Sequence, residues 1–161
     1  MTVREAEKRL AGNRAKFEAV AALLGAPQTM RKVPQSAIEA HEMLLQGMPT
    51  KALTHLVQNL VIIDWDDAFA KAVGMSERTF QRHTTAAAKA LSPEQSGRAW
   101  KFAEILAQAS AVFGSKEDGE QWLEQPAVGL DGRRPIDLLA TPAGVELVED
   151  FLVRLEYGVY A

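Results

Sequence analysis

The sequence contains no cysteine among its 161 residues, and this absence removes several kinds of chemistry at once. Disulfide bonds, thiolate catalysis and cysteine-ligated zinc sites are all excluded. No apolar run reaches the roughly 18 residues that a membrane span requires, so we expect no span. The first residues, MTVREAEKRL, are charged where a signal peptide would be apolar, so we expect the protein to stay in the cytoplasm.

Recognisable catalytic and metal-binding patterns are also missing. His41, His55 and His83 are far apart in the sequence, and none lies in an H-E-x-x-H setting. There is no Gly-x-Ser-x-Gly segment, and the loop at residues 125–134 lacks the strand, the glycine pattern and the lysine of a phosphate-binding loop. We therefore expect a protein that is not an enzyme and that uses neither a metal nor a cofactor.

The residues that are present predict a helical globular fold. Apolar residues make up 47% of the chain and charged residues 24%, which is typical of a soluble domain with a sizeable core. Helical stripes of apolar residues alternate with capping residues, glycines and prolines, so the predicted fold class is all-α. Helices are expected to begin near residues 3, 36, 50, 64, 76, 92, 115, 135 and 141. The first of them could also be two short helices divided at Gly12 and Asn13.

Some details of these helices can be specified further. The apolar residues 60–63 resemble a short strand but are assigned to the end of the third helix, and Asp64 is expected to cap the fourth. The tryptophans are expected to anchor the core. The core-facing residues predicted for the long sixth helix and the last helix are Phe102, Ile105, Leu106, Ala109, Phe113, Val145, Val148, Leu152 and Leu155.

Charge alternates along the chain in blocks. Residues 1–32 carry seven basic and three acidic side chains, and residues 33–67 carry one basic and five acidic. Residues 68–101 carry six basic and two acidic, and residues 102–161 carry four basic and eleven acidic. This pattern is consistent either with two different binding surfaces or with the ordinary solvation of exposed helices.

Residues 66–85, DDAFAKAVGMSERTFQRHTT, match a DNA-binding helix-turn-helix. Ala70 is the small residue where the two helices touch, and Gly74 is the turn glycine that takes a positive φ. Ser76 caps the second helix. The apolar positions that face the core are Phe69, Val73, Met75 and Phe80.

If this unit docks in the major groove, one face of its second helix contacts the DNA. Arg78 and Arg82 are one turn apart and could reach guanine edges or phosphates, whereas Gln81 could read adenine. Glu77 is unfavourable beside phosphate, and a buried helical hairpin with a solvated face remains the alternative. The candidate DNA-binding residues are Ser76, Arg78, Gln81, Arg82 and Thr85.

Further motifs lie on both sides of this unit. Their residues are Gly47, Pro49, Leu53, Leu56, Leu60, Ser96, Arg98, the segment 111–114, Trp122, Leu123, Pro126, Gly129, Leu130, Asp131, Gly132, the segment 135–139, Thr141, Pro142, Gly144, Val148, Leu152, Arg154, Glu156 and Gly158. Together with the helix-turn-helix they resemble the Xre/MbcA/ParS antitoxin family, whose members pair with RES-domain toxins in bacterial type II toxin–antitoxin systems. The resemblance covers about residues 34–161 and is most specific in its C-terminal part.

This resemblance implies three regions and two partners. Residues 1–33 would be an N-terminal arm and linker, residues 34–91 an Xre-like helix-turn-helix and dimerisation region, and residues 92–161 a toxin-binding domain. The family implies that the chain is a homodimer that binds its operator DNA and represses its own operon. It also implies that the C-terminal segment blocks the NAD pocket of an NAD-consuming or ADP-ribosylating RES-domain toxin.

The acidic C-terminal third is chemically compatible with such a role. An NAD pocket attracts phosphates through basic groups, and tyrosines are frequent interface anchors. The alternatives are that Tyr157 and Tyr160 cover this chain's own core, or that the protein is a helix-turn-helix regulator with a C-terminal dimerisation or ligand-sensing domain. The candidate toxin-binding residues are Arg133, Arg134, Glu149, Arg154, Glu156, Tyr157, Val159, Tyr160 and Ala161. Of these, Arg133 and Arg134 follow the glycines of the loop at residues 125–134 and are expected to be exposed.

Overall fold

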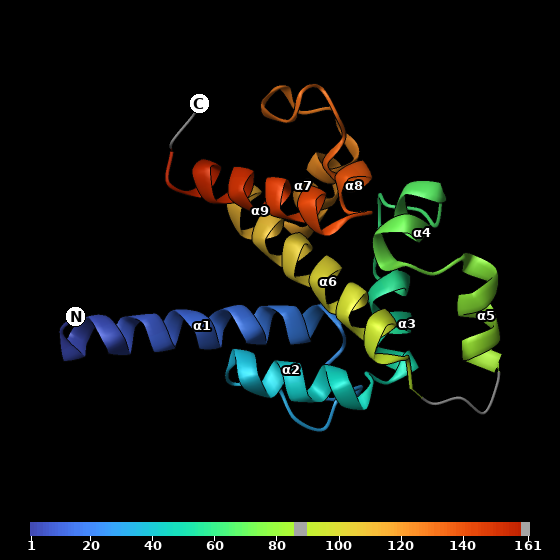
Figure 1. Cartoon of the computed structure of the whole chain (residues 1–161), viewed down its shortest axis with the longest axis horizontal. Helices are drawn as coiled ribbons and strands as arrows, with labels where there is room; N and C mark the ends of the chain where they lie inside the picture. Colours follow the sequence, from blue (N-terminus) through green and yellow to red (C-terminus); the bar gives the residue numbers. More distant parts are fainter. Residues whose placement is uncertain (86–89, 159–161) are drawn as a thin grey trace.

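The computed structural model describes residues 1–85 and 90–158 and is helical over these ranges (Figure 1). This confirms the predicted all-α fold. No helix in the described ranges has the length and apolarity to cross a membrane. The helices are α1 (Val3–Leu23), α2 (Ala37–Gln46), α3 (Thr50–Gln58), α4 (Asp67–Val73), α5 (Glu77–Thr85), α6 (Pro93–Phe113), α7 (Lys116–Glu124), the short 3-10 helix η1 (Val128–Leu130), α8 (Pro135–Leu138) and α9 (Pro142–Glu156).

Helix α6 is the axis of the molecule. It crosses between α1 and α2 on one side and α7 and α9 on the other, and α4 packs near its first half (Figure 1). It begins with a capping box, in which Ser92 and Gln95 satisfy each other's backbone N–H groups. Its buried face includes Trp100, Phe102 and Leu106. Because this helix contacts both halves of the chain, their buried residues belong to one shared core.

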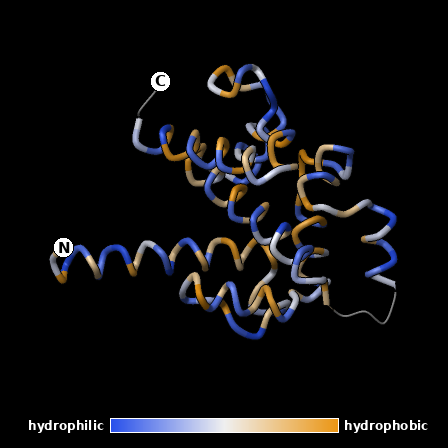
Figure 2. Tube along the Cα trace, viewed as in Figure 1, coloured by the Kyte–Doolittle hydropathy of each residue, from blue (hydrophilic) through white to orange (hydrophobic). Residues whose placement is uncertain are grey.

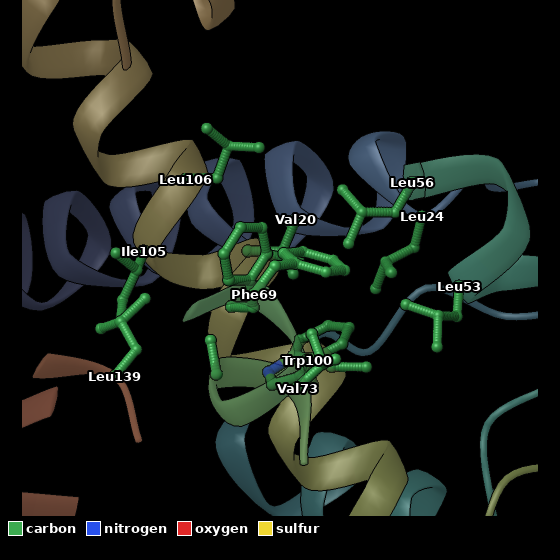
Figure 3. Packing of buried hydrophobic residues seen from close by; sticks show 14 of the residues in the cluster. Val20, Leu24, Leu53, Leu56, Phe69, Val73, Trp100, Ile105, Leu106 and Leu139 are labelled. Carbon is green, nitrogen blue, oxygen red and sulfur yellow. The ribbon is translucent and has the colours of Figure 1, made fainter. Parts of the chain in front are cut away.

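The buried side chains form one connected cluster (Figure 3). Phe69 of α4 meets the edge of Phe102 at 5.0 Å between ring centroids, and Phe17 of α1 lies 6.3 Å from Trp100. Apolar residues gather on the inward sides of the helices, while the first turns of α1 are largely hydrophilic (Figure 2). Trp100 is fully buried, and Trp65 and Trp122 are half-buried against the cluster, as the sequence predicts.

Helix α1 is continuous, so Gly12 and Asn13 do not divide it. Its buried residues, Phe17, Val20 and Ala21, all lie in its second half. The first half projects beyond the other helices (Figure 1). A capping box between Thr2 and Glu5 stabilises the projecting end.

Three expectations about the helices were wrong. Helix α3 ends at Gln58, so residues 60–63 are not part of it. Asp66, rather than Asp64, caps α4 by accepting a hydrogen bond from the Phe69 N–H at 3.0 Å. Phe113 is 36% exposed rather than buried, because it ends α6 at the surface and stacks on Trp122.

Candidate functional site

The helix-turn-helix forms as the sequence predicts. Gly74 ends α4 in the left-handed conformation, with φ of 67°, and the Met75 N–H donates to the Ala70 carbonyl at 3.0 Å. Ser76 caps α5 by accepting from the Thr79 N–H at 3.1 Å. Trp65 lies behind this unit, stacked on Phe80 at 4.6 Å. The four predicted core-facing residues, Phe69, Val73, Met75 and Phe80, are all buried.

The outer face of α5 is open to solvent. The five candidate DNA-binding residues, Ser76, Arg78, Gln81, Arg82 and Thr85, are all exposed. The ion pairs found among the described residues include neither Arg78 nor Arg82. Two arginines one turn apart therefore present their charge to solvent, while Ser76 and Thr85 already bond within the helix. The arrangement is chemically suited to phosphate, although contact with DNA stays a prediction.

Arg98 of α6 holds the end of α4 from behind. Its guanidinium donates to the carbonyls of Lys71 and Ala72 at the end of α4, and to the carbonyl of Ala140 between α8 and α9. A Cβ at Gly74 would lie 2.7 Å from the Arg98 Cδ, so the turn glycine also leaves room for this side chain. Arg98 thus joins the helix-turn-helix to the C-terminal helices, a role that the sequence alone did not reveal.

Glu120 of α7 is a second such connection, also missed by sequence reasoning. Its carboxylate is fully buried and accepts hydrogen bonds from the backbone N–H groups of Val61, Ile62 and Ile63 at 2.9–3.1 Å. Lys116 Nζ lies 2.7 Å from its other oxygen. This carboxylate explains why α3 stops early: the N–H groups of residues 61–63 turn toward Glu120 instead of continuing the helix.

The ionisation of Glu120 follows from these contacts. Burial alone would raise the pKa of this carboxyl, but the hydrogen bonds from Lys116, Ile62 and Ile63 outweigh burial and leave the pKa lowered. The group is therefore a carboxylate at neutral pH. Its role is to hold α7 against the segment after α3, because its hydrogen-bond donors are groups of this chain.

A third connection comes from Ser96 of α6. Its hydroxyl oxygen is buried and accepts from the Met48 N–H, between α2 and α3, at 2.7 Å. Three side chains thus form hydrogen bonds with the main chain of the first half: Ser96 before α3, Glu120 after α3 and Arg98 at the end of α4. We call these three residues the backbone-binding set.

Two of the candidate toxin-binding residues are engaged within this chain. Arg134 was expected to be exposed, but it is half-buried and pairs with Glu124 at 2.8 Å and Asp137 at 3.0 Å. Burial raises the pKa of Glu124, and Arg134 only partly offsets it. Glu149 pairs with Lys101 at 3.2 Å. These side chains could contact a partner only with part of their surface.

The remaining candidates are open or lie outside the described residues. Arg133, Arg154, Glu156 and Tyr157 are exposed, and Tyr157 keeps 75% of its surface accessible. Tyr157 therefore does not cover this chain's own core, which was the alternative considered for it. Val159, Tyr160 and Ala161 lie outside the described residues.

The described residues contain no group of three or more His, Asp or Glu side chains that could hold a metal ion. The histidine with the clearest partner is His55, whose Nδ1 lies 3.2 Å from the Leu23 carbonyl, a contact between α3 and the end of α1. The exposed surfaces described above carry charged and aromatic side chains suited to binding a partner. On the parts of these surfaces that the structure describes, no nucleophilic side chain lies beside a general base.

Two family models match consecutive parts of the chain. Residues 39–104 match the antitoxin Xre-like helix-turn-helix domain, and residues 108–158 match the antitoxin Xre/MbcA/ParS C-terminal toxin-binding domain. The first match ends, and the second begins, within α6. Residues 1–38 lie outside both.

Three curated relatives share one name. Antitoxin Xre of Yersinia enterocolitica is 34% identical over 92 residues, which are 56% of this chain and 62% of that protein. Antitoxin Xre of Pseudomonas putida is 34% identical over 68 residues, 42% of this chain and 43% of the relative. Antitoxin Xre of Photorhabdus laumondii is 26% identical over 117 residues, 72% of this chain and 77% of the relative. The matched region thus spans less than two thirds of the first two relatives.

Proposed function

This chain belongs to the Xre/MbcA/ParS antitoxin family, and from that premise we propose that it is an antitoxin that binds and neutralises a cognate RES-domain toxin. The observation that carries the proposal is the match of residues 108–158 to a toxin-binding domain directly after a helix-turn-helix. In this proposal the protein acts by binding in the cytoplasm and catalyses no reaction. The proposed regions are an arm at residues 1–33, a helix-turn-helix and dimerisation region at 34–91 and a toxin-binding region at 92–161.

The second part of the proposal is repression of the chain's own operon. The exposed arginines of α5 support it, as does the excess of basic residues in 68–101. Release of counterions from DNA phosphates would favour binding at this surface. A homodimer would place two copies of α5 on two half-sites of one operator.

Replacing both Arg78 and Arg82 by alanine is expected to weaken operator binding. The plot of log affinity against log salt concentration should become flatter by about 0.9 for each DNA phosphate that the variant no longer neutralises. Fluorescence anisotropy with operator DNA at several salt concentrations measures both quantities. The matched control is the Arg4→Ala, Arg9→Ala variant, which removes the same charge from the exposed half of α1. If that control flattens the slope and the α5 variant does not, the DNA surface lies on the arm.

For the toxin, we propose that the segment after α9 enters and blocks the NAD pocket. Tyr157 is the last candidate on this segment within the described residues, and its exposed ring is free to enter a partner. Glu156 and Arg154 are also exposed beside it. The acidic excess of residues 102–161 would attract the basic groups expected in a pocket for a dinucleotide.

Ending the chain after Glu156 tests this mechanism. The truncated protein should lose at least about tenfold in protection against the toxin, because tyrosine anchors of this kind dominate binding energy. Operator affinity should stay at the wild-type value, since α5 is untouched. Toxin inhibition assayed by NAD consumption, alongside operator anisotropy, gives both values. Full protection by the truncated protein would refute the blocking mechanism.

A second candidate function has one specific observation in its favour. A pocket of about 280 Å³ lies between α4, α6 and the α8–α9 connection, lined mainly by apolar side chains together with Arg98 and Lys101. Such a pocket could serve a helix-turn-helix regulator that senses a small molecule. Co-purification with a RES-domain protein encoded beside this chain's gene would favour the antitoxin over this alternative.

A further inference from the structure

Apolar side chains on the C-terminal helices form a row that is partly open to solvent: Trp122 and Phe151 are half-buried, whereas Phe113, Val128 and Leu147 are exposed. Phe113 stacks on Trp122 at 5.3 Å, and Trp122 stacks on Phe151 at 6.1 Å, so rings from α6, α7 and α9 form one line. Leu147 lies one turn before Phe151 on α9 and is 56% exposed. Val128, in η1, is 96% exposed. We call Phe113, Trp122, Val128, Leu147 and Phe151 the aromatic row.

The loop that presents Val128 is firmly held. The Ala127 N–H donates to the Arg133 carbonyl, and the Gly132 N–H returns to the Ala127 carbonyl at 2.9 Å. A Cβ at Gly129 would overlap the Phe151 ring, so the loop backbone lies directly on that ring. Arg134 fixes the end of the loop through Glu124 and Asp137. Val128 is therefore kept in the open by a fixed backbone.

Apolar side chains that gather on the surface of a soluble protein are typical of a protein-binding surface. The exposed charges on the same helices are mostly acidic: Glu117 and Asp118 on α7, and Glu146 and Asp150 on α9. The acidic residues of α7 and α9 outnumber the exposed cations nearby, Arg133 and Arg154. This excess of negative charge repels nucleic acid and anionic membranes, and it also disfavours a second copy of the same face. It fits a folded protein that carries cations beside its own apolar site.

We propose that the aromatic row is the docking surface for the toxin, with Val128 as its protruding anchor. This inference rests on the proposed function, and every residue of the row falls within the 108–158 match. The surface is separate from the segment after α9. The row fixes the toxin on the body of the antitoxin, and the C-terminal segment then reaches the toxin's pocket.

The test compares Val128→Glu with Ile38→Glu. Both side chains are highly exposed, 96% and 65%, and both changes add one negative charge, but Ile38 lies on α2, away from the row. The probe is the purified RES-domain protein encoded beside this chain's gene, titrated by calorimetry. Val128→Glu should raise the dissociation constant at least about tenfold, because it places an unpaired charge in an apolar contact. Ile38→Glu should bind like the wild type, and both variants should keep the wild-type melting temperature and operator affinity.

The outcomes separate this inference from the function on which it rests. Wild-type toxin affinity in Val128→Glu would overturn the docking surface and leave the antitoxin function standing. Equal weakening by both variants would also overturn it, since charge alone would then be the cause. A wild-type protein that does not bind the RES-domain protein would overturn both.

Discussion

Glu120→Gln is expected to lower the free energy of unfolding by about 3 kcal/mol, a large share of the total stability of a domain this size. Glutamine is nearly the same shape, but it replaces one acceptor oxygen by an N–H donor. That donor would face either the N–H groups of residues 61–63 or the ammonium of Lys116. Urea denaturation followed by circular dichroism gives the difference. Glu117→Gln makes the same chemical change at an exposed position of α7 and should have little effect.

The loss of unfolding free energy caused by Glu120→Gln should depend on pH. Because the pKa of Glu120 is lowered in the folded state, its contribution is fully present above the ordinary glutamate value of about 4.3. It is lost as the pH falls through the lower pKa of the folded protein. The stabilities of the wild type and of Glu120→Gln should therefore converge in acid. A difference that stayed constant down to the acid unfolding transition would contradict the role of the ionised carboxylate.

Gly144→Ala is expected to destabilise the protein by about 2 kcal/mol, although alanine normally favours a helix over glycine. Gly144 lies in the first turn of α9, and an added Cβ would overlap the Leu138 carbonyl at the end of α8. The two helices would have to move apart. The change should appear as a lower urea midpoint with an unchanged slope.

Gly97→Ala provides the matched control. Gly97 is also inside a helix, α6, but a Cβ there would meet no atom within 4 Å. The free energy of unfolding of this variant should rise by about 0.5–1 kcal/mol, because alanine has the higher helix propensity. If both variants were stabilised equally, close packing of α9 on α8 would not be the reason for glycine at 144.

The sequence was most informative where structure is determined locally. Ser92, Ser115 and Thr141 cap the helices that were predicted from them, and Gly74 takes the positive φ that its place in the turn requires. Each of these assignments depends on atoms within a few residues. The exposed face of α5 followed from the same local periodicity.

The errors arose where distant residues decide the outcome. Residues 60–63 have the apolar character of a helix end, but the carboxylate of Glu120, 57–59 positions later in the chain, binds the N–H groups of residues 61–63. The sequence predicted an exposed cation at Arg134, but the fold places Glu124 beside it. The aromatic row was missed for the same reason, because Phe113, Trp122 and Phe151 are brought into line only by packing of three helices.

The backbone-binding set has a consequence for how such proteins can diversify. The three side chains of this set belong to the second half of the chain and form hydrogen bonds with main-chain atoms of the first half. Main-chain atoms are the same whatever side chains surround them. The exposed residues of α5 and of the C-terminal helices can therefore change while the contacts of the backbone-binding set stay the same. A chimaera built by exchanging halves between two relatives would therefore keep these contacts if the parent of its second half carries all three side chains. Under the proposed function, recombination between relatives would then combine the operator preference of one parent with the toxin preference of the other.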